Sequence, residues 1–68
     1  MKQPVDPDAL RAHCLELTAE ATEHFKLLRD YSLTPGNAWL AKAELAKIGN
    51  LMGELDHLLE QIKQADAI

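Results

Sequence analysis

The 68-residue chain lacks the covalent and metal links that stabilise many small domains. It contains a single cysteine, Cys14, so no disulfide can form within one copy. No cluster of histidine, cysteine and carboxylate residues shows the spacing of a metal site. A core of this size is marginal unless a disulfide, a metal or association with another chain supplements it. We therefore expect the chain to associate, either with a second copy or with another protein.

Aromatic residues and long apolar runs are also scarce. Aromatics make up 4% of the chain although 47% of it is hydrophobic, most of that leucine and alanine. This composition is typical of helices packed on helices. The apolar runs are far shorter than the roughly 20 residues that cross a bilayer, and no signal-peptide core is evident. We expect no membrane association, and a lone unpaired cysteine favours a cytoplasmic location.

Basic residues are few, with seven Lys and Arg against eleven Asp and Glu and a net charge of −4. Such a surface repels nucleic-acid phosphate unless its cations cluster. An RNA-binding protein would need Lys26, Arg29, Lys42 and Lys47 to converge across the face of a dimer. The charge of the chain thus disfavours nucleic acid as a partner. A catalytic Ser-His-Asp set, a phosphate-binding glycine loop and a Cys-x-x-Cys pair are all missing, so we expect neither an enzyme nor a cofactor.

The chain does contain a clear helix start at Asp6-Pro7-Asp8. Asp6 is a good N-cap, Pro7 suits the first helical position, and Asp8 lies at the positive end of the helix dipole. Apolar and small residues then recur every three or four positions, which predicts a helix over residues 7–31 with one buried side. That side comprises Leu10, Cys14, Leu17, Ala21, His24, Leu28 and Tyr31.

Thr34-Pro35 repeats this start signal and predicts a second helix over residues 35–65. The connection, residues 32–34, is short enough to make the two helices antiparallel. The apolar rhythm resumes at once and continues without a break. Its members are Ala38, Ala41, Leu45, Ile48, Met52, Leu55, Leu59 and Ile62.

These patterns predict an all-α protein, a single antiparallel two-helix hairpin over residues 1–68. Leu40, Leu51 and Leu58 make the apolar side of the second helix wider than one partner helix covers, so we expect two hairpins to form a four-helix bundle. In length and pattern the chain resembles Rop, a hairpin that dimerises in this way, and small helical co-chaperones of bacterial secretion systems. We expect the core and dimer contact to include Leu10, Leu17, Leu28, Leu45, Ile48, Leu51, Met52, Leu55, Leu58, Leu59 and Ile62.

A second stripe on the 35–65 helix lies opposite the leucines and consists of small residues bracketed by an aromatic and a histidine. Another protein's backbone can approach closely there, so we assign the stripe as the partner-binding surface. Trp39 has two readings: it covers the turn against Leu33, or it is an exposed binding hot spot. The stripe comprises Trp39, Ala43, Ala46, Asn50, Gly53 and His57.

Three further features, a histidine, a Glu-x-x-His pair and the cysteine, each have a chemical and a structural interpretation. His24 is either a pH-sensitive core group or a boundary histidine paired with Glu20. Glu54 and His57 have the Glu-x-x-His spacing of di-iron bundles, but both point away from the leucines, so we expect no metal. Cys14 lies among apolar residues, where a thiol is usually an inert core group.

The function that these observations favour is a small non-enzymatic helical module, a homodimer that binds another protein and modulates it as an adaptor, inhibitor or co-chaperone. The alternative is a Rop-like RNA-binding regulatory dimer. The sequence does not distinguish a stable homodimer from one subunit of a hetero-complex, because both bury the same leucines.

Overall fold

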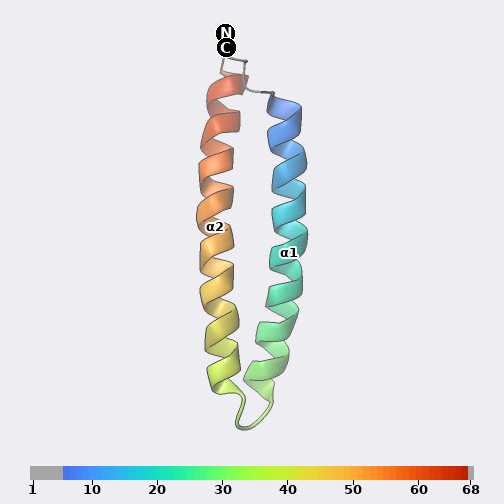
Figure 1. The fold of residues 1–68 in the computed structure, drawn as a ribbon, viewed down its shortest axis with the longest axis vertical. Helices are drawn as coiled ribbons and strands as arrows, with labels where there is room; N and C mark the ends of the chain where they lie inside the picture. The colour runs from blue at the N-terminus through green and yellow to red at the C-terminus, as the bar shows by residue number, and fades with distance from the viewer. Residues whose placement is uncertain (1–5, 68) are drawn as a thin grey trace.

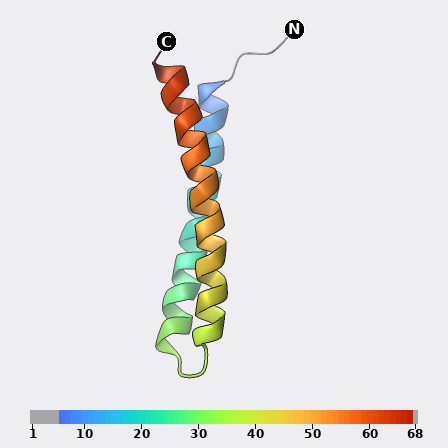
Figure 2. The same cartoon turned by 90° about the vertical axis from the view of Figure 1, so that its left-hand side faces the viewer.

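The computed structural model describes residues 6–67 and contains two helices, α1 (Pro7–Leu33) and α2 (Ala38–Asp66). The two lie antiparallel and side by side, with the turn at one end and the start of α1 beside the end of α2 at the other (Figures 1 and 2). The predicted all-α helical hairpin is confirmed. Neither helix in the described range is both long and apolar enough to cross a membrane.

The start of α1 follows the predicted capping. The Asp6 carboxylate accepts a hydrogen bond of 3.0 Å from the backbone N–H of Asp8, and Pro7 occupies the first turn. This bond satisfies one of the N–H groups that the first turn of a helix leaves free.

The turn differs from the prediction. Thr34 ends α1 instead of starting α2, since its backbone N–H donates to the Tyr31 carbonyl and its hydroxyl donates to the Asp30 carbonyl at 2.9 Å. Gly36 then reverses the chain with φ +86°, a conformation that residues with a Cβ rarely adopt. As a result α1 runs two residues further than expected, and α2 begins at Ala38 instead of Pro35.

The interface between the helices follows a strict seven-residue repeat. On α1, every residue of the predicted buried side is buried or half-buried, from Leu10 to Tyr31. A seven-residue repeat keeps a narrow seam facing the partner helix along the whole length of a hairpin. The buried residues of α2 alternate at steps of three and four: Ala41, Glu44, Ile48, Leu51, Leu55, Leu58 and Ile62.

On α2 the seam matches the expected apolar stripe only in part, since four of the eight residues of the stripe are buried. Leu45, Met52 and Leu59, which were expected in the core and dimer contact, are 56%, 41% and 56% exposed in the single hairpin. Leu51 and Leu58, which were expected to widen the apolar side, are buried in the seam. The apolar residues of α2 lie on three of the seven heptad positions. Only two of these positions pack against α1.

The hairpin core is thin. Its central cluster joins Leu17 and Ala21 of α1 to three leucines of α2, with Leu10 and Cys14 packed at its edge. Within residues 6–67 no large side chain has less than 2% of its surface exposed. Two helices alone therefore leave even their best-packed residues in partial contact with solvent.

Gly36 in the turn and Gly53 within α2 should respond in opposite ways to substitution by alanine. Gly36→Ala should lower the free energy of unfolding by about 1 kcal/mol, because alanine strains a positive-φ position. The matched change Gly53→Ala should raise it by about 0.5–1 kcal/mol, because a Cβ there meets nothing within 4 Å and alanine is the better helix former. Urea unfolding followed by circular dichroism at a fixed protein concentration measures both. Equal stability of Gly36→Ala and the wild type would contradict the turn described here.

Candidate interaction surfaces

A polar contact crosses the hairpin seam between His24 of α1 and Glu44 of α2. The His24 Nδ1 and Glu44 Oε2 atoms are 2.5 Å apart, and the two side chains are 20% and 8% exposed. The other carboxylate oxygen accepts a bond from the Lys47 ammonium at 3.4 Å. Both oxygens of the buried carboxylate are thus satisfied. Among the described residues no buried side-chain nitrogen or oxygen lacks a hydrogen-bond partner.

These partners change the acidity of Glu44. The hydrogen bond from His24 is the largest cause that lowers the pKa of Glu44 below its ordinary value, and Lys47 lowers it further, while burial acts in the opposite direction. The sequence analysis offered Glu20 as a partner of His24, but the structure provides Glu44 from the other helix.

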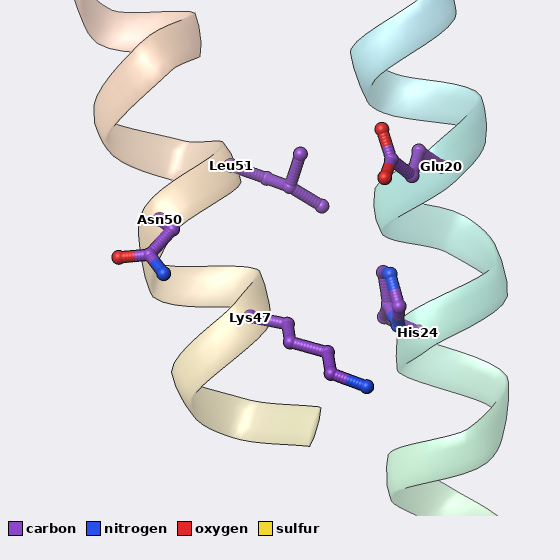
Figure 3. Close-up of a pocket in the computed structure, with 5 residues that line it drawn as sticks. All are labelled: Glu20, His24, Lys47, Asn50 and Leu51. Carbon is purple, nitrogen blue, oxygen red and sulfur yellow. The ribbon is translucent and has the colours of Figure 1, made fainter. Parts of the chain in front are cut away.

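Beside this contact lies an open groove of about 380 Å³ between the helices, lined by Glu20, His24, Lys47, Asn50 and Leu51. Figure 3 shows Lys47 reaching towards α1, His24 lying on the facing side, and Asn50 pointing away from α1. The imidazole and the ammonium in this groove are both bound to Glu44. The groove therefore offers few unpaired polar groups with which to hold a small ligand.

The predicted partner-binding stripe is exposed along its whole length. Trp39 has 69% of its surface exposed and Leu33 has 77%, so Trp39 does not shelter Leu33 at the turn. The structure therefore contradicts the interpretation that Trp39 covers the turn against Leu33. We name this surface the Trp39 stripe. Its residues are Trp39, Ala43, Ala46, Asn50, Gly53 and His57.

A second exposed surface is apolar and lies along one side of the hairpin. Arg11 of α1 donates to both carboxylate oxygens of Asp66 of α2, at 2.8 and 2.6 Å. This ion pair shows that the two residues lie on the same side of the hairpin. Residues at seven-residue steps from each partner face the same way in a heptad-packed pair. From Arg11 those steps reach Thr18 and Phe25, and from Asp66 they reach Leu59, Met52 and Leu45.

Leu15 lies one turn from Arg11 on the adjoining strip of α1 and is 72% exposed. Phe25, at 49%, is the aromatic member of this side. Five of the eight large exposed hydrophobic residues of the described chain thus lie together. We name this surface the Met52 face; it comprises Leu15, Phe25, Leu45, Met52 and Leu59.

The cations that an RNA-binding dimer would need are mostly engaged with acids. Lys26 binds Glu23 at 3.4 Å and Arg29 binds the adjacent Asp30 at 3.2 Å. Lys47 is held by Glu44 near the seam. Three of the four cations that this alternative requires are therefore already paired with acids.

The other candidate residues have ordinary surroundings. His57 lies within 3.4 Å of Gln61, one turn further along α2. Within residues 6–67 no three histidine, cysteine or acidic side chains are grouped so as to hold a metal ion, and Glu54 and His57 are both exposed. Cys14 is a half-buried free thiol packed against the hydrophobic cluster.

Sequence reasoning missed Glu44. A signal was present, since Glu44 is seven residues before Leu51 and fourteen before Leu58, which places it on one strip of the helix with two leucines. Leucine on that strip indicates burial, and a buried glutamate requires a partner. His24 was already assigned to the facing side of the first helix.

Comparison with protein-family models gives no match, and neither curated protein sequences nor solved structures give one. The surfaces described above therefore carry the functional argument.

The lowered pKa of Glu44 predicts loss of stability in acid. The folded state binds a proton at Glu44 less readily than the unfolded state, so the stabilisation is complete above the ordinary glutamate value near 4.5 and is lost as the pH falls through the lower folded value. Glu44→Gln should flatten this dependence of the free energy of unfolding on pH. Glu16→Gln, at an exposed position of α1, is the matched control for the loss of one carboxylate. Parallel acid profiles for Glu44→Gln and the wild type would contradict the contact.

Replacement of the pair by leucine tests its role in a different way. Each single change, His24→Leu or Glu44→Leu, should lower the melting temperature, because it leaves the other polar group in the seam without its partner. The double change should restore or exceed wild-type stability, since two well-packed apolar residues replace a polar pair. If the two single effects simply add in the double variant, His24 and Glu44 do not interact.

Proposed function

We propose that this chain is a small non-enzymatic helical module that binds another protein through the Trp39 stripe and modulates it, as an adaptor, inhibitor or co-chaperone. The observation that carries the proposal is the position of Trp39, 69% exposed on a well-formed helix and followed along the same strip by small residues. Tryptophan is among the residues that contribute most to binding energy at protein interfaces.

The small residues support a helical partner. The distance between two packed helices depends on the side chains at their contact. Ala43, Ala46 and Gly53 project little from α2, and a Cβ placed on Gly53 would have nothing within 4 Å. A partner helix can therefore lie close to the backbone of α2 with Trp39 at one end of the contact.

Binding is favoured over catalysis because two of the three titratable groups that line the groove are held by Glu44. His24 and Lys47 both contact Glu44, which leaves neither imidazole nor ammonium free to act on a substrate. A half-buried thiol packed on a hydrophobic cluster agrees with a reducing compartment, so we assign the protein to the cytoplasm.

The test places a photoreactive amino acid at Ala43 in the chain expressed in its native cells. We expect one dominant crosslinked protein, which Trp39→Ala removes and Trp39→Phe retains in part. A photoreactive group at Ala12, exposed on α1, is the matched control and should not give this product. Because Trp39 is mostly exposed, Trp39→Ala should change the free energy of unfolding by only about 0.5 kcal/mol. The same product from both positions, or one that survives Trp39→Ala, would contradict the proposal.

A further inference from the structure

We propose that a second copy of this chain covers the Met52 face, with the two hairpins related by a two-fold axis and their turns at opposite ends. The proposal goes beyond binding through the Trp39 stripe, because it concerns a different side of the molecule and a different partner. The apolar residues of the two helices lie at matching heights along the hairpin.

Two contacts set limits on how α1 and α2 are aligned along the hairpin. In antiparallel helices, a step forward along α1 is level with a step back along α2. Counted in this way from the His24–Glu44 contact, Glu20 is level with Ile48. Counted from the Arg11–Asp66 contact, Glu20 is level with His57. Between these limits, Glu20 and Leu51 line the same groove and face each other in Figure 3. The height of Glu20 on α1 therefore corresponds to that of Leu51 and Met52 on α2.

The exposed apolar residues are spaced evenly about this height. On α1, Leu15 lies five residues before Glu20 and Phe25 lies five residues after it. On α2, Leu45 lies seven residues before Met52 and Leu59 lies seven residues after it. A single two-fold axis that crosses both helices at this level pairs these residues with their counterparts in a second copy.

This axis brings Leu15 opposite Phe25, Leu45 opposite Leu59, and Met52 opposite itself. Two-fold contacts require such self-complementarity, because each residue of the patch must meet a suitable residue of the same patch. An unrelated partner would need no symmetry of this kind. The spacing on both helices therefore favours a second copy as the occupant.

The size of the face also suits a dimer. Five large side chains with between two-fifths and three-quarters of their surface exposed offer roughly 500 Å² in each copy, so a pair buries on the order of 1,000 Å² before flanking residues are counted. Stable interfaces begin at about 1,200 Å² in total. The threonines between Leu15 and Phe25, Thr18 and Thr22, bond their hydroxyls to carbonyls of their own helix, which leaves their methyl groups for the contact.

The experiment combines solution mass with site-specific crosslinking of the full chain. Sedimentation over a concentration series should give twice the chain mass of 7.6 kDa. Met52→Asp should raise the dissociation constant at least about 100-fold, because the dimer would bury two unpaired charges at its centre. Leu33→Asp, at an exposed position near the turn, is the matched control and should remain dimeric.

Cysteine crosslinking tests the arrangement with changes smaller than a buried charge. In a Cys14→Ser background, Met52→Cys should form a disulfide between copies under mild oxidation. Leu45→Cys alone should not do so, but a mixture of Leu45→Cys and Leu59→Cys chains should. Crosslinking of Leu45→Cys with itself would overturn the proposed axis. A folded wild-type chain that stays monomeric at high concentration would overturn the dimer while leaving the Trp39 crosslinking test unaffected.

Discussion

The contact between His24 and Glu44 sets how α2 is rotated about its own axis, and the rest of the structure depends on this rotation. Glu44 and Leu45 are neighbours that point about 100° apart on a helix. Because Glu44 turns inward to His24, Leu45 turns outward, and seven-residue steps carry Met52 and Leu59 outward with it. A polar pair inside the seam thereby determines which apolar residues remain on the surface. Buried polar residues have this role in coiled coils, where they select one register at some expense of stability.

The consequence is a hairpin with more apolar surface than it can bury. The seam uses two of the three apolar strips of α2, and no large residue in the described chain is fully buried. Small domains without a disulfide or a metal usually need a further contact to be stable. In the proposed dimer, the Met52 face provides this further contact with a second copy of the chain. The Trp39 stripe, on the outer side of α2, then remains open. The two surfaces can therefore serve self-association and partner binding at the same time.

The sequence predicted α1 well because its pattern has one solution. On that helix only two neighbouring strips are mainly apolar or small, so the buried side from Leu10 to Tyr31 follows directly. On α2 three neighbouring strips are apolar. The strip through Leu45 carries its only charge at Asp66, the last residue of the helix, whereas the strip through Leu51 begins with Glu44. Periodicity alone therefore did not identify which two of the three strips pack against α1. The correct choice requires pairing Glu44 with His24 across the hairpin, which is a contact between helices that local patterns do not specify.

The two helix starts show a similar contrast. Asp6-Pro7-Asp8 begins α1, and the predicted cap forms. Thr34-Pro35 has the same form, but Ser32 and Leu33 extend α1, and Thr34 bonds back to that helix. The chain then needs Gly36 at positive φ to reverse its direction. Of the candidate surfaces, the Trp39 stripe was predicted from the sequence. Leu45, Met52 and Leu59 were expected in the core and dimer contact, but their separation from the seam between the two helices appears only once the rotation of α2 is known.

The most direct test of this account is an NMR titration of the Glu44 side-chain carboxylate in the full chain. The account predicts that the pKa of Glu44 lies below the ordinary glutamate value near 4.5, because the hydrogen bond from His24 stabilises the charged form. A pKa of Glu44 at the ordinary value would mean that Glu44 does not contact His24 and faces solvent. In that case α2 is rotated as the apolar pattern alone suggests, Leu45 and Met52 face α1, and the Met52 face does not exist.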